Sequence, residues 1–179
     1  SAKLQFFERG NVYIMNGHKM DKVELIVRGG TWHCYPERIQ IEFITELYYA
    51  ANVFYDQNEG IPLRSMLELD DEVMLNKGAK CRIIGLTLET RPDFGIKNFS
   101  SNIVSEQETE NGFTYRRLRH IIYNLRRFGC TRIEFGIQHT DNDILENINR
   151  GSTIGDAIYT IKLMKDCCFK IVGHWMPDL

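Results

Sequence analysis

The segment Gly129-Cys130-Thr131-Arg132-Ile133-Glu134-Phe135-Gly136-Ile137-Gln138 decides the fold class of this chain. Residues Thr131 to Ile137 have the apolar character of a buried strand, and the strand ends at the polar Gln138. A loop with Asn149-Arg150-Gly151 and a further helical stretch follow. In β/α barrels the functional side chains lie where strands end, so this segment predicts one part of such a site.

Three other predicted strands end in the same way. The strand over Val23 to Val27 leads into Gly29-Gly30-Thr31, and the strand over Cys81 to Leu88 leads into Glu89-Thr90-Arg91-Pro92-Asp93. The strand over Lys170 to Gly173 leads into His174-Trp175-Met176-Pro177-Asp178. Polar or glycine-rich ends on separate strands indicate an enzyme barrel, or a piece of one.

Helical patterns separate these strands. They cover residues 36–56, 114–128, 141–148 and 153–167, and Gly129 is a typical helix stop. Strands that alternate with helices predict an α/β fold with parallel strands. About four strands cannot close an eight-stranded barrel, so we expect a partial (β/α) barrel that is part of a larger one.

The remaining segments are polar. Residues 1–20 predict an N-terminal arm, a single helix or the remnant of a tag, and residues 21–179 predict the barrel core. Residues 57–79 are turn-rich and charged, and residues 94–113 predict a polar surface excursion.

The length, net charge and cysteine content of the chain exclude few classes of protein. The chain has 179 residues, which suits one domain, and its net charge of -2 gives no argument for nucleic-acid binding. We see no signal peptide and no apolar run of about 20 residues, so no membrane association is expected. The 5 cysteines form no CxxC pair, which favours buried free thiols in a reducing, cytoplasmic setting over disulfides or a metal site.

Three stretches of the sequence match one known family. They are Asp21 to Thr31, Leu88 to Asp93, and Gly129 to Gln138, the last continuing through Asn149-Arg150-Gly151 and Phe169 to Leu179. In this order they resemble the catalytic subunit of Elongator, a radical SAM tRNA-modifying acetyltransferase. The resemblance covers about residues 20–179 apart from the excursion, and it implies a barrel of the radical SAM type. The family's three cluster-binding cysteines and its acetyltransferase domain have no counterpart in this sequence, so the chain resembles a central fragment.

The resemblance implies an activity for the parent protein. It would add an acetyl-derived carboxymethyl group to carbon 5 of the wobble uridine in tRNA, with S-adenosylmethionine, acetyl-CoA and a 4Fe–4S cluster. It also implies tRNA and other Elongator subunits as partners. The fragment alone is expected to be inactive, and the alternative is an inactive tRNA-binding or subunit-binding remnant. A different barrel enzyme, such as a metal hydrolase, is disfavoured because no His or carboxylate cluster has ligand spacing.

The resemblance also assigns residues near the first strand. Lys22 would contact acetyl-CoA and take part in catalysis, although it could equally be a solvated strand-edge lysine. Gly29 and Gly30 would let the backbone approach the amino-acid end of S-adenosylmethionine, or they form only a tight turn. Thr31 stands where many radical SAM enzymes have Glu.

The other strand ends would contact S-adenosylmethionine or substrate. Glu89 and Gln138 are candidate catalytic residues, and Arg91, Arg150 and His174 are candidate binding residues. The structural alternatives are a salt bridge of Glu89 to a neighbouring arginine, backbone capping for Gln138 and Arg150, and a purely structural role for His174.

The helix over 114–128 is basic. A basic helix can follow a phosphate backbone, which predicts RNA binding, but it could also be a solvated face that pairs with the acidic residues 106–110. The candidate RNA-binding residues are Arg116, Arg117, Arg119, Arg126 and Arg127.

Overall fold

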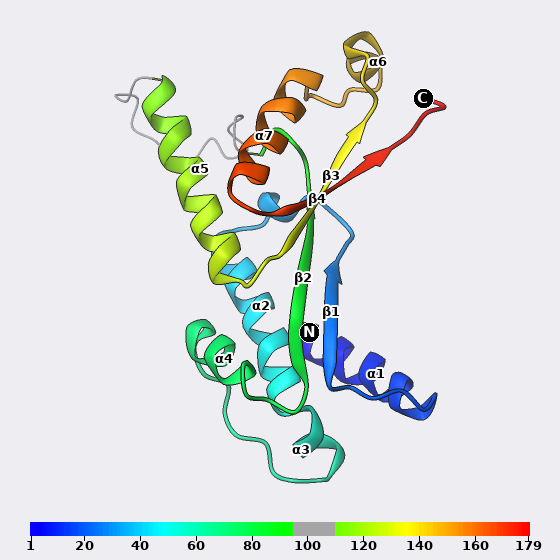
Figure 1. Ribbon diagram of the computed structural model, residues 1–179, viewed down its shortest axis with the longest axis vertical. Coiled ribbons are helices and arrows are strands. Elements are labelled where there is room, and N and C mark those ends of the chain that lie inside the picture. Colours follow the sequence, from blue (N-terminus) through cyan, green and yellow to red (C-terminus); the bar gives the residue numbers. More distant parts are fainter. Residues whose placement is uncertain (95–109) are drawn as a thin grey trace. The chain divides into compact units, whose positions relative to one another are not determined.

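The computed structural model describes residues 1–94 and 110–179, and the side chains of residues 1–94 and 118–179 (Figure 1). Most of the excursion predicted at 94–113 therefore lies outside the described residues. The strands are β1 (Lys22–Val27), β2 (Arg82–Thr90), β3 (Arg132–Gln138) and β4 (Lys170–Trp175). The helices are α1 (Ala2–Met15), η1 (Trp32–Cys34), α2 (Glu37–Asn52), α3 (Phe54–Asn58), α4 (Leu69–Asn76), α5 (Glu110–Arg127), α6 (Asn142–Asn147) and α7 (Ile154–Asp166).

The four strands form one open sheet in the order β1-β2-β3-β4. β2 pairs with β3 and β3 pairs with β4 in parallel, with Glu89 opposite Glu134 and Gly136 opposite His174. The sequence order equals the spatial order, as in a barrel whose consecutive strands are joined by helices. The predicted partial (β/α) barrel is therefore confirmed.

The chain divides into two compact units. The first contains Ser1–Leu25, Tyr35–Leu86 and Arg127–Gly129, and the second contains Ile26–Cys34, Thr87–Arg126 and Cys130–Leu179. β1 and β2 begin in the first unit and end in the second. The predicted strand ends after β1, β2, β3 and β4 thus all belong to the second unit.

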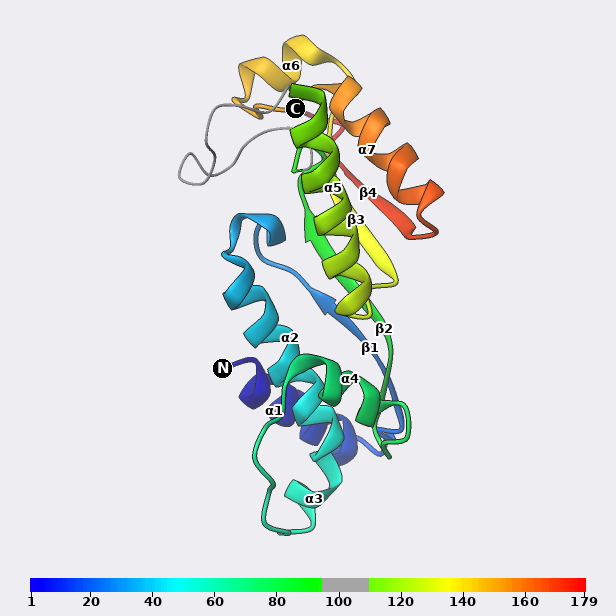
Figure 2. The same cartoon turned by 90° about the vertical axis from the view of Figure 1, so that its left-hand side faces the viewer.

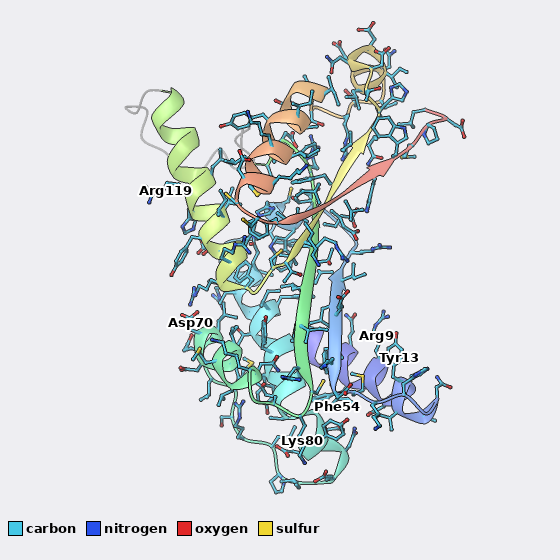
Figure 3. All side chains as sticks on the ribbon, in the orientation of Figure 1. Arg9, Tyr13, Phe54, Asp70, Lys80 and Arg119 are labelled. Atoms are coloured by element: carbon cyan, nitrogen blue, oxygen red, sulfur yellow. The ribbon has the colours of Figure 1, made fainter. Side chains whose placement is uncertain are left out.

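In the first unit, α1 packs on α2, and α2 packs on α4 (Figure 2). The fully buried ring of Phe54 (labelled in Figure 3) contacts Phe6 and Phe7 of α1, with ring centroids 6.0 and 6.4 Å apart. Gly10 lets α1 approach Phe54, because a Cβ there would collide with the ring. Residues 1–20 therefore contain a packed helix rather than a loose arm.

The charged segment 57–79 contains α4, which the turn-rich composition did not predict. The fully buried Glu72 accepts hydrogen bonds from Arg64 Nη1 and Nη2, both at 2.6 Å, and from Asn52 Nδ2 at 2.7 Å. Burial acts to raise the pKa of Glu72, but these bonds and one from the Leu67 N–H hold it below the ordinary value. Glu72 is thus the anchor that orders this segment.

In the second unit, the two faces of the sheet differ. Ile133 and Phe135 are fully buried on one face of β3, and Leu125 of α5 and Met164 of α7 are fully buried as well. α7 packs against β4 (Figure 1) and begins with a capping box formed by Thr153 and Asp156. Because strand side chains alternate, Glu134 lies on the opposite, polar face.

The predicted helix stop at Gly129 is confirmed, while the helix before it starts earlier than expected. α5 begins at Glu110 rather than Thr114 and ends at Arg127. Gly129 has φ 74°, a conformation that favours glycine, and a Cβ there would collide with the hydroxyl of Tyr48. That hydroxyl donates to the Phe128 carbonyl oxygen at 3.2 Å.

All five cysteines are free, but only two of them are buried. Burial raises the pKa of the Cys81 thiol to about 11 and that of the Cys130 thiol to about 12. Cys34 and Cys168 are exposed and Cys167 is half-buried. The expectation of buried thiols was therefore wrong for these three residues, because Cys34 ends the short helix η1 and Cys167 and Cys168 follow the end of α7, outside the strands.

Candidate functional site

Four charged or titratable side chains meet on the polar face of the second unit. Arg28 follows β1, Glu89 lies near the end of β2, Glu134 lies within β3 and His174 lies near the end of β4. The parallel register places Glu89 directly opposite Glu134. We call these residues the strand-end cluster.

Glu134 is the centre of the strand-end cluster. Its Oε2 lies 2.9 Å from His174 Nε2 and 3.4 Å from Arg28 Nη2. Glu134 is only 4% exposed, and a buried carboxylate is costly unless such partners satisfy it. Sequence reasoning missed Glu134 as a site residue because it lies inside an apolar run.

Glu89 and His174 form the accessible part of the cluster. His174 Nδ1 lies 3.4 Å from Glu89 Oε1, and the two side chains are 31% and 27% exposed, respectively. Among the described residues, no hydrogen bond to the Glu89 carboxylate is found, so its lone pairs are open to a ligand. The alternative salt bridge between Glu89 and Arg91 does not form, because Arg91 pairs with Asp93 instead.

Arg91 is fixed by contacts within the chain. Its Nε and Nη2 donate to the two carboxylate oxygens of Asp93 at 2.9 and 2.8 Å, and the Asp93 side chain is 1% exposed. Arg91 Nη2 also donates to the Arg150 carbonyl oxygen at 2.6 Å. The bidentate pair with Asp93 fixes the Arg91 side chain, and the hydrogen bond to the Arg150 carbonyl oxygen then joins the loop after α6 to the end of β2.

Arg150 continues this chain of contacts to β3. Its Nη2 donates to the Gly136 carbonyl oxygen at 2.6 Å, while its buried Nε has no hydrogen-bond partner among the described residues. Burial, together with the neighbouring Arg91 charge, lowers the pKa of Arg150 from its ordinary value. An unsatisfied buried donor next to a polar strand end is a candidate contact for an anionic ligand group.

Gln138 ends β3 in an unusual conformation. Its φ is 71°, and the pairing with β4 is irregular between Gly136 and Gln138. A non-glycine residue in this region is uncommon and marks a strained position. The Gln138 carbonyl oxygen accepts from the Met176 N–H at 2.9 Å, so the backbone of Gln138 is bonded and its side-chain amide is left for other contacts.

The glycine loop after β1 leads to a histidine that the sequence did not single out. Gly29 has φ 111°, and a Cβ there would meet no atom within 4 Å, so glycine serves the backbone conformation. After Gly30 and Thr31, His33 Nδ1 lies 2.9 Å from the Thr90 hydroxyl. The His33 ring stacks on the buried Phe94 at 4.2 Å between centroids, which ties this loop to the end of β2.

Lys22 is not part of the second unit, which contains the strand-end cluster. It is the exposed first residue of β1 and belongs to the first unit. Its backbone N–H donates to Asp21 Oδ1 at 2.9 Å. Its predicted contact with acetyl-CoA stays a prediction.

The basic helix α5 is only partly open. Arg119 is exposed and points outward (Figure 3). Arg126 donates to the Cys167 carbonyl oxygen and lies 4.0 Å from the Phe169 ring centroid, and Arg127 pairs with Asp70 at 2.8 Å. Arg126 and Arg127, which were predicted to bind RNA, are thus held by contacts within the chain. The side chains of Arg116 and Arg117, and the acidic residues 106–109, lie outside the described residues.

The described residues contain no group of three potential ligands that could hold a metal ion. In the same part of the chain, the helices are too short or too polar to cross a membrane.

No protein-family model matches the chain. Elongator complex protein 3 of Drosophila melanogaster is 33% identical to it over 163 residues, and the human protein is 32% identical over the same length. These matches cover 91% of this chain and 24% of each relative, so the chain spans about a quarter of the length of these relatives.

A solved structure, archaeal Methanocaldococcus infernus Elp3 with N-terminus deletion (1-46), has a similar fold. The TM-score is 0.76 at 29% sequence identity, and the match covers 99% of this chain and 34% of the archaeal chain. Sequence and fold thus agree on the same relatives.

Proposed function

We propose a function from the premise that this chain is homologous to a segment of Elongator complex protein 3. The chain is the part of a tRNA-modifying transferase that holds S-adenosylmethionine at the carboxyl ends of its strands. The whole protein would use acetyl-CoA to modify carbon 5 of the wobble uridine and would work with other Elongator subunits in the cytoplasm. The observation that supports this most is the strand-end cluster, which leaves the Glu89 carboxylate open.

The residues present fit the amino-acid and ribose groups of S-adenosylmethionine. Glu89 offers acceptor lone pairs for an ammonium or hydroxyl group. The buried Nε–H of Arg150 has no hydrogen-bond partner among the described residues and could donate to a ligand. The glycine loop at Gly29 and Gly30 exposes backbone next to Thr31, and Gln138 and His174 add polar groups at the ends of β3 and β4. Bound S-adenosylmethionine supplies the radical chemistry of this enzyme class, and these residues bind and orient it.

The cysteines do not fit a 4Fe–4S cluster. Cys81 and Cys130 are buried in different units with strongly raised thiol pKa values, whereas cluster ligands are thiolates. Cys167 and Cys168 are adjacent in the sequence. Neither of them, nor Cys34, is part of a CxxC motif. These cysteines would therefore not hold such a cluster, and the function proposed for the strand-end residues is binding of S-adenosylmethionine.

An alternative function is binding without catalysis. The exposed Arg119, one turn before the exposed Tyr123, gives α5 a charged and aromatic surface that suits tRNA. The poor fit of the cysteines to a cluster favours this alternative for the isolated chain. Lys22, if it contacts acetyl-CoA, favours the enzymatic proposal.

Calorimetric titration of the chain with S-adenosylhomocysteine, a stable analogue, tests the proposal. We expect saturable binding that Glu89→Gln weakens about tenfold or more, because a charged hydrogen-bond acceptor is lost. Glu146→Gln, at an exposed position of α6, is the matched control and should bind like the unaltered chain. Equal binding by both variants, or none by the unaltered chain, would contradict the proposal, and tRNA binding that depends on Arg119 would then support the alternative.

A further inference from the structure

We propose that Glu134 is a positioning residue that keeps the proton of His174 away from Glu89, so that the Glu89 carboxylate stays open for a ligand that donates hydrogen bonds. The inference rests on the proposed cofactor-binding function for its ligand, but its geometry stands on the cluster alone. Glu134 is almost fully buried and, on this proposal, does not touch the ligand. It acts through His174.

Two carboxylates compete for one imidazole ring. His174 Nε2 lies 2.9 Å from Glu134 Oε2, and Nδ1 lies 3.4 Å from Glu89 Oε1. A neutral imidazole has one N–H donor and one acceptor nitrogen, so it can donate to only one of them. The shorter distance gives the donor to Glu134, because hydrogen bonds from ring N–H groups have donor–acceptor distances of about 2.7–3.2 Å.

Burial makes this preference strong. Glu134 is 4% exposed, so water cannot replace the hydrogen bond from His174, whereas Glu89 is 27% exposed in its side chain and can be solvated. Arg28 Nη2, 3.4 Å from the same Oε2, places a positive charge beside this acceptor. The ring of His174 is thereby fixed with its Nδ1 edge toward Glu89.

The consequence for Glu89 is chemical. An acceptor nitrogen beside a carboxylate adds no hydrogen bond to it, so the Glu89 oxygens keep their lone pairs for ligand hydroxyl or ammonium groups. Without Glu134, His174 would turn its proton to Glu89 and occupy one of these oxygens. Glu134 therefore controls the affinity of a site that it does not touch.

Long-range ¹H–¹⁵N correlation spectra of the chain reveal which ring nitrogen of each of its 5 histidines carries a proton. The His174 signals are assigned by their loss in His174→Gln. We expect the neutral ring of His174 to carry its proton on Nε2 in the unaltered chain, and its Nδ1 to be unprotonated. In Glu134→Gln we expect the neutral ring to carry its proton on Nδ1, toward Glu89, while Glu89→Gln should keep it on Nε2.

An unprotonated Nε2 in the unaltered chain, or spectra that Glu134→Gln leaves unchanged, would overturn the proposal. Loss of structure cannot imitate the expected result, because the other four histidines should keep their signals in each variant. Glutamine is isosteric with glutamate, and Glu134→Asp, whose shorter side chain withdraws the carboxylate from Nε2, provides a second variant that should shift the proton in the same direction.

Titration with S-adenosylhomocysteine completes the test. Glu134→Gln should weaken binding about tenfold, and adding it to Glu89→Gln should weaken binding no further, because Glu134 acts through Glu89. Additive losses in the double variant would overturn the positioning role. If the unaltered chain does not bind the analogue, the proposed function fails, whereas the spectra alone still decide the position of the His174 proton.

Discussion

The guanidinium of Arg150 lies directly against the backbone of Gly136. Nη2 donates to the Gly136 carbonyl oxygen at 2.6 Å, and a Cβ at position 136 would lie 2.5 Å from the same nitrogen. A larger residue at position 136 would have to displace this arginine side chain, which reaches back from the loop after α6. The hydrogen bond joins the loop after α6 to β3.

Gly136→Ala should destabilise the chain. The new methyl group must push Arg150 away and break its hydrogen bond, and overpacking of this kind costs about 1–3 kcal/mol of the free energy of unfolding. Urea unfolding measures the change. Gly155→Ala in α7 is the control, because its Cβ meets only ordinary contacts and alanine favours helices, so it should be neutral or slightly stabilising. Equal stability of both variants would contradict the close approach of Arg150.

Asp93→Asn should lower the free energy of unfolding more than the same substitution of an exposed aspartate. Asp93 is 1% exposed and accepts both donors of Arg91, which in turn holds the Arg150 carbonyl oxygen. Removing one partner of a buried ion pair costs about 3 kcal/mol or more. Chemical unfolding of Asp93→Asn against Asp71→Asn, an exposed residue of α4, measures it. A difference below about 0.5 kcal/mol would show that the pair does not anchor the loop.

Stability should fall in acid partly because of Glu72. Its pKa is lower in the folded chain than its ordinary value of 4.5, so the ionised form is favoured by folding. This stabilisation is fully present above about pH 4.5 and is lost as the pH falls through the folded-state pKa. Glu72→Gln should therefore be less stable at pH 7 and show a flatter acid dependence, whereas the exposed Glu59→Gln should follow the unaltered curve. Parallel curves for all three chains would refute the assignment.

The cysteines should react at very different rates. The thiol pKa values of Cys81 and Cys130 are about 11 and about 12, so at pH 8 only about one in a thousand or fewer of these thiols is in the thiolate form. Alkylation by iodoacetamide, located by peptide mass spectrometry, should modify Cys34 and Cys168 first. Unfolding in urea should make all five react alike. Early modification of Cys130 in the folded chain would show that it is not buried.

The sequence predicted the strands and their polar ends because both signals are local. A short apolar run followed by glycine or polar residues was sufficient to place Glu89, Gln138 and His174 correctly on or next to strands. Glu134 was not found, since a single acidic residue inside an apolar run gives no sign of the partner that satisfies it. That partner, His174, is distant in sequence and becomes a neighbour only through the pairing of β3 with β4.

Charged helices were predicted less well. α4 was missed because Asp70-Asp71-Glu72 resembles a solvated turn, although Glu72 is fully buried through its contacts with Arg64 and Asn52. Arg126 and Arg127 of α5 were predicted to face RNA, but their contacts with Cys167 and Asp70 depend on tertiary structure. A helical pattern shows which side is polar, and not which charges already have partners.

The opposition of Glu89 and Glu134 across β2 and β3 limits the order in which these positions can evolve. Two carboxylates that face each other in a sheet repel, and here the charge of Arg28 relieves that repulsion while His174 hydrogen-bonds to Glu134. A lineage that lost His174 or Arg28 first would pass through a disfavoured intermediate, whereas prior loss of Glu134 removes the conflict. Drift in this sheet is therefore expected to follow one direction, with the buried acid changing before the residues that contact it.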